Sequence, residues 1–205
     1  LKMQGVYLNG NRNGTWTEYF EDGKRKTELN YLNGKFNGLQ SYWSSNGNKV
    51  QEKNYINGKQ QGLWTIYYQE TGIKKEETNY TDGVQEGLWT EWYEDGQKRR
   101  ERNFKDGERD SIWTTWYKNG NKKFLASYSN GNKIQEKNYI NGKQQGLWTL
   151  YYQETGIKKE ETNYIDGVQE GLWTEWYEDG QKRRERNFKD GERDSTWTTW
   201  YENGN

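Results

Sequence analysis

The sequence predicts an all-β protein: an elongated, single-layer antiparallel sheet of tandem β-hairpin repeats of about 24 residues. Three observations support this fold class. A large internal duplication covers much of the chain, a shorter motif recurs within it, and Asn-Gly or Asp-Gly pairs return about every 11 to 13 residues. A fixed period in this range is typical of repeat proteins. Asn-Gly and Asp-Gly pairs favour hairpin turns because both residues accept positive φ.

The duplication consists of residues 45–121 and 129–205, which differ at only five of 77 positions. We therefore predict one continuous repeat array over residues 1–205, with the two near-identical blocks as its parts. The chain begins within a repeat and stops within a turn. We expect it to be a segment of a longer protein.

Each repeat has two halves. The first half, as in residues 62–68, starts at a glycine and is rich in Trp, Thr, Ile and Tyr, which favour strands. The second half, as in residues 98–104, is rich in Lys, Arg and Glu. Turn pairs such as 95–96 and 106–107 follow the halves, so each repeat is predicted to be a hairpin. We expect about 17 strands and no helix longer than one turn.

The predicted register of the first hairpin pairs Tyr19 with Arg25 and Glu18 with Lys26. An aromatic ring and a cation then face each other, and so do two opposite charges. Such cross-strand pairs stabilise a sheet by roughly 0.2–1 kcal/mol each. Because no single pair is strong, the repetition itself must provide the stability.

The full motif reads Gly-x-Trp-x-x-Tyr/Trp-Tyr, then Asp-Gly-x-Lys/Arg-Lys/Arg, then Tyr/Phe-x-Asn/Asp-Gly-Lys-x-x-Gly. It resembles the MORN repeat family over nearly the whole chain, most closely the bacterial variant described as antitoxin-like. The resemblance implies elongated sheets of stacked hairpins without catalytic activity. It also implies roles in lipid contact, protein scaffolding or toxin neutralisation. With the recent-looking duplication, it favours a bacterial, extracellular or cell-surface setting.

The composition excludes several kinds of chemistry. The chain has no Cys and no His, which removes thiol nucleophiles, disulfides, structural zinc and imidazole bases. Lys and Arg number 31, as do Asp and Glu, so the basic excess typical of nucleic-acid binding is missing. No apolar run approaches the roughly 20 residues that span a membrane. We expect no enzyme activity, no cofactor, no nucleic-acid partner and no transmembrane segment.

Carboxylates do not form a candidate catalytic or metal site. Glu76 and Glu77 are adjacent on a predicted strand, so their side chains point to opposite faces. They predict cross-strand charge pairing. The Asp-Gly turns offer few carboxylates, whereas calcium takes six to eight oxygen ligands.

The Trp and Tyr rows form the candidate interaction surface. A surface of this kind suits a protein partner or a sugar, but recurrence in every repeat also predicts that the rings pack the fold itself. We favour packing, and the two interpretations are compatible. The candidate residues are Trp64, Tyr68, Trp89, Tyr93, Trp113, Tyr117, Trp148, Tyr152, Trp173 and Tyr177.

The leading functional hypothesis is a non-catalytic repeat scaffold with an extended surface for protein interaction or assembly, such as a bacterial surface or fibre protein. The expected partner is a protein or a second copy of the chain. One alternative is an antitoxin or immunity protein that binds a toxin. Another is a carbohydrate-binding surface module.

One junction breaks the period. Residues 111 and 146 are 35 positions apart instead of 24, and residues 121–131 look like one additional strand. Each duplicated block of 84 residues then holds seven strands, an odd number. Since every turn of a meander reverses the chain, Trp89 and its copy Trp173 should lie on strands of opposite direction. Turns of the Glu-Asp-Gly type should change edge after this junction.

Replacing Trp89 tests the packing role of the rings. We expect Trp89→Phe to cost little stability and Trp89→Ala to cost more. Truncation of a large buried aromatic residue costs about 3–5 kcal/mol in a full core, and we expect less here because one face of the sheet stays wet. Thermal melts of both variants measure the difference, and equal melting points for wild type and Trp89→Ala would exclude a packing role.

Overall fold

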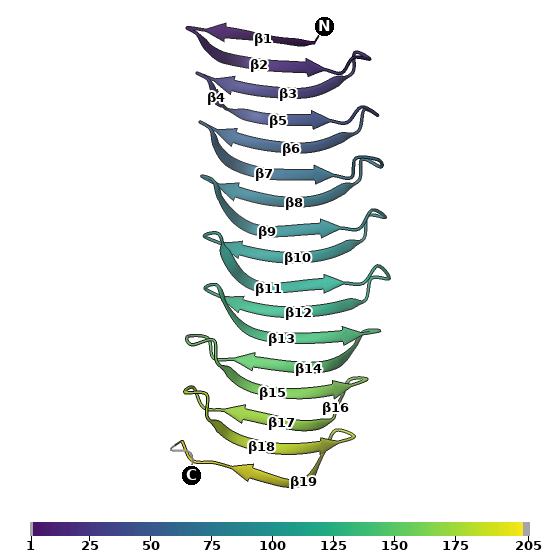
Figure 1. Cartoon of the computed structure of the whole chain (residues 1–205), viewed down its shortest axis with the longest axis vertical. Helices are drawn as coiled ribbons and strands as arrows, with labels where there is room; N and C mark the ends of the chain where they lie inside the picture. Colours follow the sequence, from purple (N-terminus) through teal and green to yellow (C-terminus); the bar gives the residue numbers. More distant parts are fainter. Residues whose placement is uncertain (1, 203–205) are drawn as a thin grey trace. The chain divides into compact units, whose positions relative to one another are not determined.

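A computed structural model of the chain describes residues 2–202 (Figure 1). Within these residues it contains strands and turns and no helix. The predicted fold class is confirmed, because the strands form an open antiparallel sheet of tandem hairpins. Each strand packs mainly against its neighbours in chain order, so no second layer covers the strands of this part of the chain.

The chain divides into two compact units, and each is described by itself. The first holds the described residues up to Arg99 together with Phe104–Gly107. The second holds Arg100–Asn103 and the described residues from Glu108 onward. A single continuous array over residues 1–205 stays a prediction.

The strands of the first unit are β1 (Met3–Leu8), β2 (Asn11–Tyr19), β3 (Arg25–Leu32), β4 (Lys35–Phe36), β5 (Gly38–Trp43), β6 (Lys49–Ile56), β7 (Lys59–Tyr67), β8 (Lys74–Thr81) and β9 (Val84–Trp92). Strand β10 (Lys98–Lys105) is divided between the two units. The strands of the second unit are β11 (Glu108–Trp116), β12 (Lys122–Ser129), β13 (Asn132–Ile140), β14 (Lys143–Tyr151), β15 (Lys158–Ile165), β16 (Val168–Gln169), β17 (Gly171–Trp176), β18 (Lys182–Lys189) and β19 (Glu192–Thr199).

Two of these strands are interrupted by one residue. Asn37 separates β4 from β5, and Glu170 separates β16 from β17. Both residues still donate their backbone N–H to the neighbouring strand, at 2.9 Å. Counting each interrupted pair once, the described chain has the predicted 17 strands.

Two-residue turns lock neighbouring hairpins together. In the turn Asn33-Gly34 both residues have positive φ, 50° and 79°, as a type I′ turn requires. The N–H of Gly34 donates across to the carbonyl of Arg12 in the preceding hairpin, at 2.9 Å. Gly83 makes the same contact with the carbonyl of Gln60, at 2.9 Å. These turns therefore close their own hairpin and also hold the one before it.

The predicted register is right at the turn and wrong beyond it. Tyr19 pairs with Arg25, as predicted, but Glu18 pairs with Thr27 and not with Lys26. A β-bulge makes Lys26 an extra residue on β3, and a bulge places two residues opposite one. The expected ion pair still forms, with 3.0 Å between the Lys26 Nζ and Glu18 Oε1 atoms, because both bulged residues oppose Glu18.

The additional strand at the junction is confirmed as β12. Within the second unit β11 pairs antiparallel with β12, β12 with β13, and β13 with β14. Three reversals make β11 and β14 run in opposite directions, as their arrows in Figure 1 show. The longer turns after β11 and after β14 therefore lie at opposite edges of this unit, as predicted. Trp89 and Trp173, for which the opposite strand directions were predicted, lie in different units and are not compared. Trp113 on β11 and Trp148 on β14 both lie in the second unit and show the predicted reversal.

The junction also exchanges the two faces of the sheet, which was not predicted from the sequence. Trp113 lies opposite Ala126, Ala126 opposite Glu136, and Glu136 opposite Thr149. Directly opposed residues of neighbouring strands share a face, and adjacent residues of one strand do not. Trp148, next to Thr149, therefore lies on the face opposite to that of Trp113.

The handedness of the chain explains the exchange. Repeats of L-amino acids have a fixed hand, so a repeat cannot be replaced by its mirror image. If strand direction is reversed while the repeats continue along the same axis, the repeat must be rotated by half a turn about that axis. This rotation also turns the sheet over, so reversed direction and exchanged faces come together.

The residue that opens each repeat has a left-handed backbone. Its φ is 55° at Ser111 and 63° at Ser195, where a side chain makes this conformation strained. At Gly87 a Cβ atom would meet no neighbouring atom within 4 Å, so φ and not space favours glycine there. In the other repeats φ lies between 69° and 94°, at Gly14, Gly38, Gly62, Gly87, Gly146 and Gly171.

Replacing Ser111 by glycine should therefore stabilise the protein. Relief of the left-handed strain outweighs the added freedom of the unfolded chain, and we expect a gain of about 0.5–1 kcal/mol. Ser195→Gly should behave alike. Ser127→Gly, in the interior of β12 and without positive φ, is the control and should destabilise by roughly 0.5–1 kcal/mol. Urea unfolding measures all three, and a loss of stability in Ser111→Gly would contradict backbone strain at this residue.

Candidate functional site

A row of aromatic rings crosses the strands of the first unit. Each ring contacts the next one at its edge or at a tilt, the arrangement that aromatic pairs prefer. The centroid distances run from 4.8 to 6.5 Å along the series Tyr7, Trp16, Tyr31, Phe36, Tyr55, Trp64 and Tyr80. We call this series the ring row.

Cations lie over three of these rings, those of Trp16, Tyr31 and Trp64. The Arg12 guanidinium lies 4.5 Å from the Trp16 ring centroid, and the Lys53 ammonium lies 4.6 Å from that of Trp64. Burial lowers the pKa of Lys53. Sugars bind by stacking on open ring faces, so the covered faces favour the packing interpretation for the ring row.

The tyrosines at the longer turns form a second row with a different contact. The Tyr68 hydroxyl donates to the backbone carbonyl of Trp92, 24 residues further on, at 2.8 Å, and the Lys75 ammonium lies 5.7 Å from the Tyr68 ring centroid. In the second unit Tyr152 repeats this arrangement with Trp176 and Lys159, at 2.9 and 5.5 Å. Tyr68 and Tyr152, and likewise Tyr177, therefore tie their repeats to the next ones.

The structure thus divides the ten predicted residues into two rows. The tryptophans lie among rings contributed by the charged strands, such as Tyr55 and Tyr80, and the tyrosines lie at the turns. All ten are half-buried except Trp89, which is buried. The two blocks also place their members of these rows on opposite faces of the second unit, as Trp113 and Trp148 do.

Trp89 makes a contact that was not predicted from the sequence. Its indole N–H donates to Glu76 Oε1 at 2.6 Å, and Trp173 does the same with Glu160 at 2.5 Å. Phenylalanine has no donor and would leave this carboxylate oxygen without its partner. We therefore revise the expected cost of Trp89→Phe upward, to about 1–3 kcal/mol.

The structure shows a row of exposed aliphatic residues that was not among the site residues predicted from the sequence. In five repeats a leucine follows the opening glycine, and its side chain points to the face opposite that of the next residue, which is the motif tryptophan or Gln40. An Asn of the next strand lies opposite such a leucine, as Asn79 does opposite Leu63. The recurring Gly-Leu-Trp-Thr motif could have indicated these leucines, because adjacent residues of a strand point to opposite faces. The exposed fractions are 45% at Leu39, 51% at Leu63 and 54% at Leu88 in the first unit, and 50% at Leu147 and 54% at Leu172 in the second. We call these leucines and their opposed asparagines the Leu–Asn row.

The same face carries a tyrosine–glutamate–lysine network. Glu52 accepts hydrogen bonds from Tyr67 at 2.6 Å and from Lys49 at 2.5 Å. Burial opposes the charged form of Glu52, but these bonds outweigh it, and the pKa of Glu52 is lowered. Burial, together with the bond to Glu52, raises the pKa of Tyr67 to about 12. The near-identical block repeats the network at Tyr151, Glu136 and Lys133.

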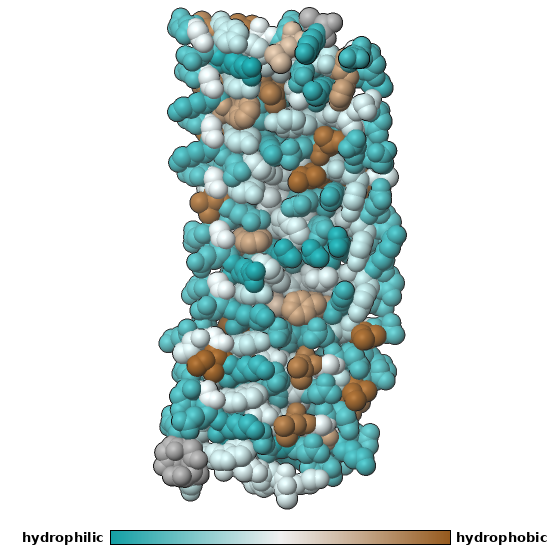
Figure 2. All heavy atoms as spheres, in the orientation of Figure 1, coloured by the Kyte–Doolittle hydropathy of each residue, from teal (hydrophilic) through white to brown (hydrophobic). Residues whose placement is uncertain are grey.

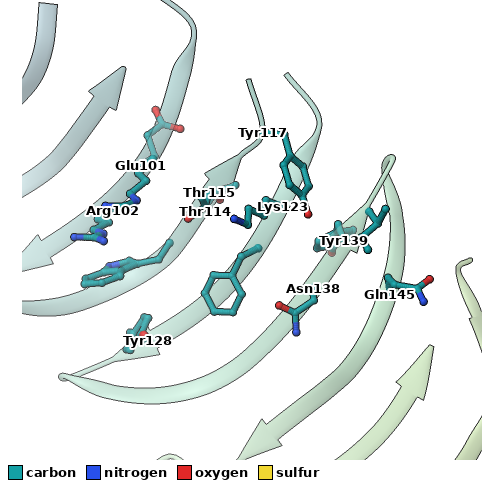
Figure 3. A pocket seen from close by; sticks show the side chains of 14 residues that line it. Glu101, Arg102, Thr114, Thr115, Tyr117, Lys123, Tyr128, Asn138, Tyr139 and Gln145 are labelled. Carbon is teal, nitrogen blue, oxygen red and sulfur yellow. The ribbon is translucent and has the colours of Figure 1, made fainter. Parts of the chain in front are cut away.

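A groove lies on the Trp113 face of the second unit, where the additional strand joins the next block (Figure 3). Its volume is about 610 Å³. Arg102, Trp113, Phe124, Tyr128 and Asn138 are among its lining residues. We call it the junction groove. Within residues 2–202 no three His, Cys, Asp or Glu side chains gather as a metal site would require.

The family model described as MORN repeat variant matches five segments of 22 residues each, which together cover more than half of the chain: residues 12–33, 36–57, 85–106, 109–130 and 169–190. The fourth segment contains β11 and β12, so the family model matches these two strands as one repeat. No curated protein matches the chain. No described helix could span a membrane.

The raised pKa of Tyr67 predicts alkaline destabilisation. An unfolded tyrosine ionises near pH 10, whereas folded Tyr67 holds its proton to about pH 12. The unfolded state therefore loses the proton first, and the free energy of unfolding should fall as pH rises from about 10 towards 12. Tyr67→Phe removes this titration, so its stability should fall less over the same interval. Urea unfolding at about pH 9 and about pH 11.5 measures both proteins, and identical pH dependence would contradict the role of Tyr67.

Proposed function

We propose, since the chain belongs to the MORN repeat variant family, that it is a non-catalytic scaffold that binds another protein through the Leu–Asn row. Repeats of this family are generally scaffolds for protein or membrane interaction. The single observation behind this choice of surface is a half-exposed leucine at the same position in five of the eight repeats, with Ile112 at that position in a sixth. The tryptophans of the ring row, in contrast, are covered by cations.

The geometry of the Leu–Asn row suits a protein partner. Leucines of successive repeats are two strands apart, or about 10 Å. Asparagine donates and accepts hydrogen bonds, so an apolar contact alternates with a polar one, as in protein interfaces. Figure 2 shows apolar side chains singly among hydrophilic ones on the face in view. A partner that extends along several repeats would make one such contact in each of them.

Two of the more specific functions predicted from the sequence are compatible with a protein-binding scaffold. A surface or fibre protein would use the Leu–Asn row for assembly with further copies, and an antitoxin would use it to cover a toxin. The ten aromatic residues are a second candidate surface, which offers ring edges and turn tyrosines. A carbohydrate-binding module is disfavoured by the covered ring faces.

Photo-crosslinking tests which face binds. A photoreactive amino acid at Leu63 should capture a partner, and the same group at Ile66, on the opposite face, should not. With the captured protein purified, Leu63→Glu should weaken binding by about tenfold or more, because a charge replaces the apolar contact. The melting temperature should hardly change, since Leu63 is half-exposed. Crosslinks from Ile66 alone would move the interaction to the aromatic face.

A further inference from the structure

The junction groove lies beside the ring pair of Trp113 and Tyr128 in the second unit, whose centroids are 4.8 Å apart. Phe124 of β12 lies opposite Asn138 of β13, so Asn138 occupies the Trp113 face where a regular repeat would continue with a tryptophan strand. Asn138 is exposed, whereas its copy Asn54, in an identical local sequence, is half-buried. The exchange of faces has thus left a hollow at the end of the rings.

The charge of the groove differs from that of a regular repeat. Its lining includes the cations Arg100, Arg102 and Lys123 and one carboxylate, Glu101. A hollow over the ring face of the first unit, beside Trp64, has a volume of about 260 Å³, with two glutamates and one lysine in its lining. The junction groove is therefore larger and carries the opposite balance of charge.

Two guanidinium groups are fixed beside the groove. Arg102 and Arg109 lie 4.8 and 4.7 Å from the Trp113 ring centroid, and Arg109 also lies 5.5 Å from that of Tyr128. A stacked guanidinium keeps its N–H groups at the edge of the plane, where they can bind a carboxylate in a bidentate manner. Stacking also fixes the side chain before a ligand arrives, which lowers the entropic cost of binding.

A half-buried apolar side chain lies among these cations. Phe124 lines the groove, and in the described chain its ring has neither a ring partner nor a cation above it. Burying a phenylalanine side chain favours binding through the hydrophobic effect. The groove therefore offers an apolar contact with anion-binding groups on its margin.

The groove also leads into the Leu–Asn row. The Asn138 side-chain amide donates to the backbone carbonyl of Leu147 at 3.3 Å. Leu147 lies two residues from Thr149, so it shares the Trp113 face. An extended chain that left the groove would meet this leucine next.

We propose that the junction groove binds an extended acidic segment of a partner protein, with an apolar or aromatic side chain against Phe124 and flanking carboxylates on Arg102 and its neighbours. The inference rests on the proposed function, because it names the chemistry of the partner. Charge complementarity selects an acidic segment, and continuity with the Leu–Asn row selects a peptide over an isolated small anion. Arg102 covers the Trp113 ring, which disfavours a stacked sugar or nucleobase.

The test uses the full chain and a synthetic peptide, acetyl-Glu-Phe-Glu-Glu-Phe-Glu-amide, with binding followed by calorimetry. We expect binding that weakens as salt rises, and none of the analogue with Lys in place of Glu. Arg102→Ala should weaken binding about tenfold. Its copy Arg186, which lies 5.0 Å from the Trp173 ring centroid, is the matched control, and Arg186→Ala should leave the affinity unchanged.

A second variant fills the groove. Asn138→Trp should abolish peptide binding, and Asn54→Trp, its copy in the first unit, should not. Circular dichroism checks that all variants keep their strand content. Equal effects of Arg102→Ala and Arg186→Ala, or no binding by wild type, would overturn the proposal. So would tighter binding of a heparin hexasaccharide that competes with the peptide. The Leu63 crosslinks distinguish the two proposals. If they form although the peptide results fail, the groove proposal is wrong and the proposed function stands.

Discussion

A sheet without a second layer can shield a side chain only with neighbours on adjacent strands, and this constraint governs the packing of the protein. Few large apolar side chains are buried, and many of the buried residues are threonines such as Thr149 and Thr162. Rings and the stems of Lys and Arg therefore cover each other across the strands. A cation–π contact of this kind gives about 0.5–1 kcal/mol when exposed. Stability accumulates because each repeat adds the same contacts to its neighbour.

The bulge in each hairpin makes these contacts possible. It adds one residue to the charged strand after the turn, so two consecutive residues oppose one partner. In the second unit Arg183 and Arg184 both approach Glu175, at 2.9 and 3.5 Å. Arg183 also lies 5.5 Å from the ring centroid of the turn residue Tyr177. The extra residue thus neutralises a carboxylate and covers the tyrosine that ties the repeat to the next one.

The junction gives a repetitive surface one place that differs from the rest. In a regular array every repeat offers the same contacts, so a partner can bind in many equivalent positions. In the second unit the repeats are not equivalent, because the reversed direction and the exchanged faces place Trp113 and Leu147 on the same face. A partner that contacts both the junction groove and the Leu–Asn row would bind in one position only. A defined position suits a scaffold better than many equivalent positions do.

The sequence by itself determined the repeats, the hairpins and the reversal of direction at β12, because these follow from the spacing of turn signals and from an odd strand count. It did not determine the exchange of faces or the one-residue bulges, since both depend on how strands pair in three dimensions. The same limit applies to loops. Residues 45–48 and 129–132 both read Ser-Asn-Gly-Asn, yet only the second segment has positive φ at both its Asn and its Gly. Trp43 pairs with Lys49 across a five-residue loop, whereas Ser129 already pairs with Asn132. The preceding strand sets this pairing, so tertiary structure selects the turn that identical residues form.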